Sequence, residues 1–101
     1  MDDLLLSKIR LAIVSELATA DWIAFSELVA TTQTTPGNLG THLAKLVDAG
    51  YVTERKQFTG RRPLTTYRLS AFGKRALIEH ADWLQAVVTP FRAARRGRKS
   101  A

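Results

Sequence analysis

A turn-like segment in the second half of the sequence combines a glycine with two adjacent arginines. In Gly60-Arg61-Arg62-Pro63 the glycine can adopt a positive φ, and the proline stiffens the segment that carries both guanidinium groups. Guanidinium groups bind phosphate oxygens and are attracted to the negative potential of a narrow, A·T-rich minor groove. The flanking stretches add cations that could contact phosphates: Arg55, Lys56 and Arg68. The segment therefore predicts a basic loop suited to a polyanion, with Gly60 at its turn.

A second candidate segment, residues 35–49, carries polar side chains at helical spacing. Thr35 followed by Pro36 is a typical helix start, and Gly50 is a typical helix end. The apolar residues fall within about a third of the helix circumference: Leu39, Leu43, Leu46 and Val47. The opposite face carries small or polar residues, with His42 at its border: Gly37, Asn38, Thr41 and Lys45.

The polar face of this predicted helix can hydrogen-bond to nucleic acid. The amide of Asn38 could pair with adenine through two hydrogen bonds, and Thr41 could bond a base or a phosphate and touch a thymine methyl group. Thr35 and the free N–H groups of the first turn suit a phosphate, and we expect Lys45 to contact the phosphate backbone.

Hydrophobic periodicity places both segments in a chain of short helices and strands. Apolar residues recur at helical spacing in residues 3–18, 26–31, 35–49 and 71–88. Three segments rich in β-branched and aromatic residues are expected to be strands: 21–25, 51–58 and 64–69. Two short helices joined by a tight turn can present the second one to a major groove. The predicted fold is mainly α with a small β-hairpin, an α+β winged helix-turn-helix of order α-β-α-α-β-β-α.

Positive charge is concentrated in the second half of the chain. The formal net charge is +6, but residues 1–50 hold three basic and six acidic residues, which give −3. Residues 51–101 hold twelve basic and three acidic residues, which give +9. A surplus of cations attracts polyanions, although charge alone is equally compatible with a basic surface that only keeps the protein soluble. The position of the charge, on the loop and the C-terminal segment, favours a polyanion.

Two runs of sequence resemble a known family. Residues 38–52 contain Leu-x-x-Leu-x-x-Ala-Gly-Tyr-Val, and residues 58–70 contain Gly-Arg-Arg-Pro followed by Thr-Thr-Tyr-Arg-Leu. Together they resemble the compact winged-helix transcriptional regulators of prokaryotes related to the MarR and ArsR groups, over roughly residues 5–88. The resemblance implies a homodimer joined through its terminal helices and minor-groove contact from Arg61 or Arg62. It also implies base contacts from three residues: Asn38, Thr41 and His42.

The chain departs from those families in two respects. It has no cysteine, which removes the thiol-based sensing of metal-responsive ArsR members. It also lacks the extra helices that form ligand pockets in larger relatives. The sequence does not identify a small-molecule effector.

The last predicted helix carries an apolar stripe with the spacing of a coiled-coil seam. Its members are expected at a dimer interface: Leu77, Ala81, Leu84, Val88 and Phe91. The alternative is that this stripe packs on the first helix of the same chain. Pro90 is expected to kink or end the helix, and the basic residues after it are expected to be unstructured. We therefore predict a domain over residues 1–91, with a dimerisation helix over about 70–89, and a flexible tail over 92–101.

Other function classes find little support in the residues. No metal site is expected, because His42 and His80 are the only histidines and have no carboxylate partner at metal-binding spacing. No nucleophile with a base is assembled, so we expect neither an enzyme nor a cofactor. Trp22 and Phe25 are expected in the core, and His80 on the surface or at an interface. Trp83 is expected in structural packing, with the dimer seam or a small-molecule pocket between subunits as the alternatives. No signal peptide and no apolar run of about 18 residues is present, so a cytoplasmic protein without membrane contact is expected.

The combined features predict a sequence-specific regulator of transcription that binds double-stranded DNA as a homodimeric repressor. The alternative is a winged helix used for protein–protein interaction without affinity for DNA, because one fold serves several functions. RNA is a weaker third option, since a helix cannot enter the deep, narrow groove of A-form RNA. The basic tail is expected to contact phosphates beside the binding site.

Overall fold

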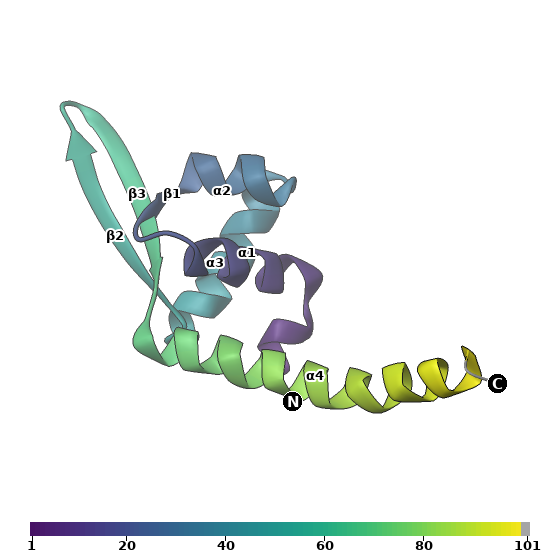
Figure 1. Ribbon diagram of the computed structural model, residues 1–101. Coiled ribbons are helices and arrows are strands. Elements are labelled where there is room, and N and C mark those ends of the chain that lie inside the picture. The colour runs from purple at the N-terminus through teal and green to yellow at the C-terminus, as the bar shows by residue number, and fades with distance from the viewer. Residues whose placement is uncertain (100–101) are drawn as a thin grey trace.

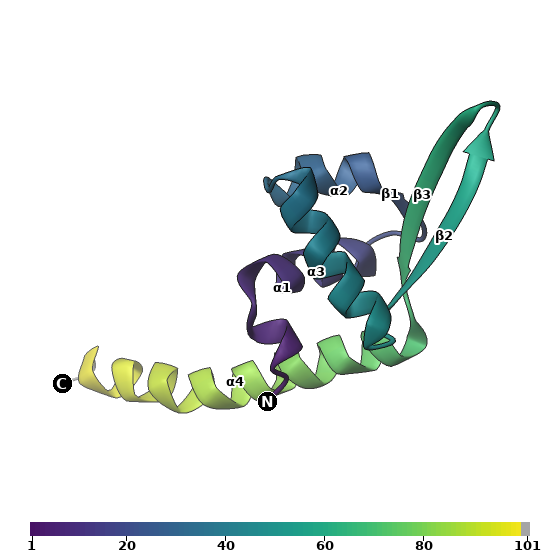
Figure 2. The same cartoon turned by 180° about the vertical axis from the view of Figure 1, so that it is seen from behind.

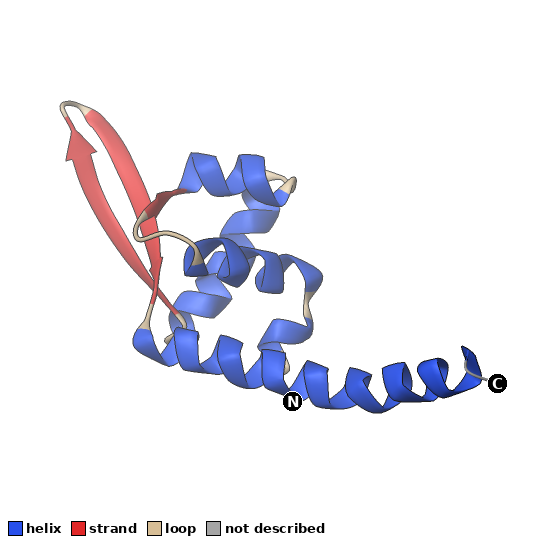
Figure 3. Cartoon of the chain, in the orientation of Figure 1, coloured by secondary structure: helices blue, strands red, loops and turns tan. Residues whose placement is uncertain are grey.

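The computed structural model describes residues 1–99, and Ser100 and Ala101 lie outside the described residues. A helical body carries a three-stranded antiparallel sheet whose hairpin projects from it (Figure 1 and Figure 3). The elements in chain order are η1 Leu4–Leu6, α1 Lys8–Ala18, β1 Ile23–Ala24, α2 Phe25–Thr32, α3 Pro36–Asp48, β2 Val52–Thr59, β3 Arg62–Leu69 and α4 Ala71–Lys99. The predicted α+β winged-helix class and the predicted order α-β-α-α-β-β-α are confirmed.

The first predicted helix, residues 3–18, is interrupted at Ser7. The Asp2 carboxylate accepts hydrogen bonds from the backbone N–H groups of Leu4 and Leu5, at 3.0 and 3.3 Å, and so holds a single 3-10 turn. Ser7 is extended, and its hydroxyl accepts from the N–H of Arg10 at 3.3 Å. Two competing caps therefore split the segment, and α1 begins later than its apolar pattern predicts.

Helices α2 and α3 form the predicted pair with a tight turn between them. The turn contains Gln33 in the left-handed region at φ 53°, which reverses the chain after α2. Thr35 then caps α3, because its hydroxyl accepts from the N–H of Asn38 at 3.1 Å, and Pro36 occupies the first helical position. Gly50, at φ 81°, lets the chain leave α3 for β2.

The hairpin, hereafter the wing, is longer and tighter than predicted. Strands β2 and β3 pair from Val52 with Leu69 to Thr59 with Arg62, which leaves a turn of only two residues, Gly60 and Arg61. Gly60 has the expected positive φ, 66°. Strand β1 pairs with β3 only at Thr66 and Tyr67, so Pro63 lies in a stretch of β3 with one neighbouring strand, where its missing N–H is tolerated.

One apolar core joins these elements. Leucines of α3 pack against α1, α2 and the strands, as the helical spacing predicts, and the fully buried large side chains are Leu5, Ile13, Val14, Leu17, Leu28, Leu39, Leu43, Leu46 and Leu69. Phe25 is partly buried against the core, whereas Trp22 lies at its margin. Within residues 1–99, none of the helices combines the length and apolar composition that a bilayer crossing requires.

Helix α4 is longer than the sequence predicts. It runs through Pro90 to Lys99, so the expectations that the helix ends near Val88 and that an unstructured tail follows residue 91 are wrong up to Lys99. Proline deprives the carbonyl of Ala86 of its helical donor, but both residues are exposed, so water can reach that carbonyl. The hydroxyl of Thr89 also donates to the carbonyl of Gln85 at 2.7 Å.

The start of α4 is fixed against the start of β2. The Ser70 hydroxyl accepts from the N–H of Gly73 at 2.9 Å and lies 2.6 Å from the carbonyl oxygen of Gly50. The Ser70 N–H donates to the carbonyl of Tyr51 at 2.9 Å. A Cβ at Gly73 would overlap that same carbonyl oxygen and lie 2.7 Å from Cδ1 of Leu69. Position 73 therefore admits only glycine without a shift of the backbone.

Replacing Gly73 by alanine is expected to destabilise the fold. Overpacking of this kind costs about 1–3 kcal/mol, which corresponds to a fall in Tm of roughly 4–8 °C for each kcal/mol in a domain of this size. The measurement is thermal unfolding followed by circular dichroism. Gly40→Ala is the matched control, because a Cβ at position 40 has no heavy atom within 4 Å. It should leave the Tm unchanged or raise it, and an equal Tm for both variants would contradict this account.

Candidate nucleic-acid interface

Helix α3 buries one face and exposes the other. Leu39, Leu43 and Leu46 are at most 1% exposed. The opposite face consists of short polar side chains and glycine, as predicted, with Lys45 one to two turns further along. The exposed members of the predicted set are Thr35, Gly37, Asn38, Thr41 and Lys45, and His42 is half-buried.

The Asn38 side chain is held in a defined position but keeps free hydrogen-bonding capacity. Its amide nitrogen donates one hydrogen to the hydroxyl of Thr34 at 2.8 Å. The second amide hydrogen and the carbonyl oxygen have no partner among the described residues, and Asn38 is exposed. A donor and an acceptor in one plane match the N7 and N6 positions of adenine.

Thr41 and Gly37 lie one turn apart on the same exposed face. The Thr41 hydroxyl donates to the carbonyl of Gly37 at 3.1 Å, so its lone pairs and its methyl group remain available. A Cβ at Gly37 would have no heavy atom within 4 Å, because the glycine faces open space. The first turn of α3 can therefore approach another surface closely.

His42 joins α3 to α1. Its Nδ1 lies 3.1 Å from a terminal nitrogen of Arg10, whose Nε donates to the carbonyl of Leu4 at 2.7 Å. A guanidinium group can only donate, so Nδ1 is the acceptor and Nε2 carries the proton. Burial lowers the pKa of His42, and the charges of Arg10 and Lys45 lower it further. The ring is therefore neutral near pH 7, and Nε2–H is the group left for a base contact.

The tip of the wing carries positive charge that pairs with no carboxylate in residues 1–99. Gly60, Arg61 and Arg62 are all exposed, and the wing extends well beyond the helical body (Figure 1). Lys56, further down β2, has a side chain that is 77% exposed, with its Nζ 3.7 Å from a carboxylate oxygen of Glu54. A weak, solvated pair of this kind leaves the ammonium group available to a phosphate.

Arg55 and Arg68 lie apart from the tip arginines. Both guanidinium groups cover the ring of Trp22, with Cζ 4.2 Å and 5.7 Å from the ring centroid. Arg68 also forms an ion pair with Asp21, at 2.9 Å. In the register of the sheet Arg55 opposes Thr66 and Arg68 opposes Thr53, so the two arginines share one face near the root of the wing. Trp22 is thus a platform for two cations, and the expectation that it is a core residue is wrong.

The opposite face of the wing root packs toward α2. The Tyr67 hydroxyl donates to Glu54 at 2.8 Å, and its ring centroid lies 6.4 Å from that of Phe25. Burial raises the pKa of Tyr67, and the bond to Glu54 raises it further, so this phenol stays protonated. These contacts fix the angle at which the wing leaves the body.

The structure brings the N-terminal end of α3 and the wing tip to the same side of the molecule. Both the N-terminal end of α3 and the wing tip lie away from α4 in the two opposite views (Figure 1 and Figure 2). Sequence reasoning missed Arg10 and Trp22 as partners of candidate residues. Their contacts join positions far apart in sequence, and no local sequence pattern predicts such pairs.

The predicted apolar stripe of α4 leaves the body of its own chain after the first three turns. Leu77 packs against the core, whereas Val88 is half-buried and Ala81 is exposed. Leu84 and Phe91 are 38% and 63% exposed. Packing on the first helix of the same chain therefore accounts for Leu77 only.

Comparison with known proteins agrees with this geometry. The family model of a winged helix DNA-binding domain matches residues 9–88. None of the curated proteins matches the chain. A solved structure of a transcriptional regulator homologue from Pyrococcus horikoshii OT3 is similar, with a TM-score of 0.81 and 28% identity over 87% of each chain.

Two further structures share the fold at lower identity. The transcriptional regulator BldR from Sulfolobus solfataricus has a TM-score of 0.71 and 17% identity, over 86% of this chain and 61% of BldR. Bacillus subtilis PadR in complex with operator DNA has a TM-score of 0.66 and 22% identity, over 78% of this chain and 48% of PadR. The predicted resemblance to prokaryotic winged-helix regulators is confirmed. With four fifths of its length matched by the family model, the chain belongs to the winged helix DNA-binding domain family.

Proposed function

We propose that this protein is a sequence-specific transcriptional regulator that binds double-stranded DNA as a homodimer and acts as a repressor. One observation carries the proposal: the N-terminal end of α3, with its exposed Thr35, Gly37 and Asn38, and the tip of the wing lie on one side of the molecule. A major groove about 12 Å wide accepts a helix, while the wing reaches the neighbouring groove. The similar fold of PadR, solved with operator DNA, supports this arrangement.

The two parts of this surface divide affinity from specificity. Asn38 and Thr41 contact base edges, with His42 Nε2 beside them, while Thr35 and Lys45 contact phosphates around the same groove. Gly37 permits the close approach. At the wing, Gly60 shapes the turn that inserts Arg61 or Arg62 into a minor groove, and Lys56 contacts a phosphate. Arg55 and Arg68 add positive potential at the wing root while they hold Trp22.

The exposed stripe of α4 supplies the dimer interface. Leu77 packs against the core of its own chain, and at 100° per residue the other stripe residues continue the Leu77 side of α4 into solvent. A second copy of the chain covers this surface through the same residues, as two-fold symmetry requires. Two recognition helices about 34 Å apart then contact a pseudo-palindromic site. A dimer bound at such a site excludes polymerase, which is the basis for repression.

The alternative is a winged helix that binds another protein and has no affinity for DNA. Such an interface would be comparatively insensitive to salt, whereas DNA binding releases counterions and weakens as salt rises. The uncharged but polar face of α3 and the basic wing tip favour DNA.

Removal of the wing-tip charge is expected to weaken DNA binding. The double variant Arg61→Ala, Arg62→Ala should lose affinity by about 10- to 100-fold, because a contact from a charged group contributes about 1 kcal/mol or more and 1.4 kcal/mol is tenfold. Gel-shift titrations with duplex DNA at several salt concentrations provide the measurement. The double variant Arg75→Ala, Arg92→Ala is the control, because it removes the same charge from α4, which lies on the other side of the body from the wing tip (Figure 1). Equal losses in both would refute a specific role of the wing.

Asn38 and Lys45 are expected to affect binding in different ways. Duplexes selected from a random pool supply the preferred site, and a scrambled duplex supplies the reference. Asn38→Ala should reduce the affinity ratio of the two by about 5- to 100-fold, since a bidentate base contact is worth about 1–3 kcal/mol of discrimination. Lys45→Ala should weaken both duplexes alike and lower the salt slope by about 0.9. An unchanged ratio in Asn38→Ala would remove this residue from base recognition.

Charge placed in the stripe is expected to dissociate the dimer. The native chain should sediment at twice the 11.2 kDa of one copy, and the double variant Leu84→Glu, Phe91→Glu at one copy. Ile78→Glu is the matched control, because Ile78 is 60% exposed on the same helix but points away from the stripe. It should remain dimeric in analytical ultracentrifugation. A native chain that sediments as a monomer at micromolar concentration would refute the homodimer.

A further inference from the structure

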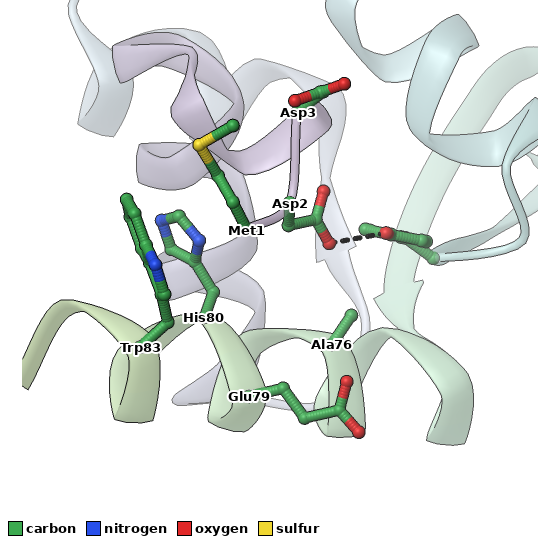
Figure 4. A pocket seen from close by; sticks show the side chains of 8 residues that line it. Met1, Asp2, Asp3, Ala76, Glu79, His80 and Trp83 are labelled. Carbon is green, nitrogen blue, oxygen red and sulfur yellow. Dashed lines mark hydrogen bonds between the residues drawn. The ribbon is translucent and has the colours of Figure 1, made fainter. Parts of the chain in front are cut away.

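A pocket lies between the N-terminal segment and α4, on the side of the body remote from the wing tip. It has a volume of about 310 Å³, at the lower end of the range for small-molecule sites, roughly 300–1,000 Å³. Its walls come from residues 1–3, from the start of β2 and from α4 (Figure 4). The lining residues on α4 are Ala76, Glu79, His80 and Trp83.

The burial of His80 in the wall of this pocket is the feature that the sequence predicts least. The sequence predicts a surface or interface residue, but the side chain is only 3% exposed, and Nδ1 has no hydrogen-bond partner among the described residues. Figure 4 shows the ring between Trp83 and Met1, pointing toward the N-terminal segment, and the His80 and Trp83 ring centroids are 5.6 Å apart. A buried polar atom without a partner is unfavourable, and a ligand that hydrogen-bonds to it relieves the cost.

The charge of the pocket is opposite to that of the protein. Asp2, Asp3 and Glu79 line it and outnumber its one cation, the N-terminal ammonium group of Met1, although the chain carries a net charge of +6. Asp2 is engaged by the hydroxyl of Tyr51 at 2.6 Å, whereas Asp3 and Glu79 form no ion pair with any described side chain. Tyr51, His80 and Trp83 add aromatic rings, whose faces attract organic ammonium groups.

We propose that this pocket binds a small organic cation, an ammonium group attached to an aromatic or apolar body. The carboxylates attract the ammonium group, which donates a hydrogen bond to Nδ1 of His80, and the ring of Trp83 contacts the body. A metal ion does not suit the pocket, because no three metal-binding side chains cluster anywhere in residues 1–99. The inference does not rest on DNA binding.

The pocket and the apolar stripe occupy different faces of α4. At 100° per residue, positions 76, 79, 80 and 83 centre on a direction about 100° from that of positions 77, 84 and 91. The pocket lining and the stripe therefore point in different directions from α4.

The test uses the fluorescence of Trp83 in the full chain. Trp22→Phe removes the other tryptophan, and a C-terminal affinity tag leaves Met1 in place. Titration with benzylamine should change the emission in a saturable way, with a dissociation constant of about 1 mM or lower, as expected for a ligand of this size. Benzyl alcohol, which has the same body without the charge, should bind at least tenfold more weakly, and benzoate should not bind.

Variants then distinguish the effect of the carboxylate charge in the pocket from that of a carboxylate elsewhere on α4. Asp3→Asn with Glu79→Gln should weaken benzylamine binding at least tenfold, whereas Asp82→Asn, on the same helix outside the pocket lining, should not change it. In NMR spectra benzylamine should shift the ring resonances of His80 and leave those of His42 unchanged.

Two results would overturn the proposal: equal binding of benzylamine and benzyl alcohol, or a shift at His42 as large as that at His80. Because no DNA is present, saturable benzylamine binding by a protein that fails to bind any duplex would refute the proposed function and leave this site standing.

Discussion

The contact between the start of β2 and the start of α4 is the constraint on which the functional surfaces depend. The carbonyl of Tyr51 accepts from the N–H of Ser70, and Gly73 lies so close to it that a methyl group would not fit. This single corner joins the end of α3, both long strands and α4. The Tyr51 ring packs on Phe72 at 5.3 Å, and burial, with the bond to Asp2, raises its pKa to about 12, so its hydroxyl remains a donor.

Because that corner is rigid, surfaces with different chemistry can point in opposite directions from one small core. On one side, α3 presents short side chains held by local bonds, such as Asn38 to Thr34, so little conformational entropy is lost when they meet a base. Long cationic side chains lie on the wing instead, where they reach outward without crowding α3. In the function that we propose, the net charge of +6 is arranged around a nearly neutral face of α3, and the attraction of DNA is separate from the choice of sequence.

The sequence predicts this fold well wherever one residue decides the local backbone. Thr35 with Pro36, Gly50, Gly60 and Ser70 start or end their elements as predicted, because capping and positive φ are local properties. The predictions that the structure contradicts failed for a different reason. Pro90 stays in a helix because solvent satisfies the freed carbonyl, and His80 is buried because residues 1–3 fold back over α4. For the candidate site, exposure of the α3 face was predictable from its period, whereas the contacts of Arg55 and Arg68 with Trp22 depend on strand register that no short pattern contains.

The length and continuity of α4 link the two sides of the molecule. One end of the helix is held at the corner that orients α3 and the wing, and the other end carries the exposed stripe far beyond the body (Figure 2). In the dimer that we propose, no flexible joint lies between the interface and the two recognition helices, so the spacing of the DNA half-sites follows from the direction of α4. The pocket at His80 sits between these ends, and Asp2 connects its wall to Tyr51 at the corner. The pocket therefore shares Tyr51 with the corner that holds the start of α4.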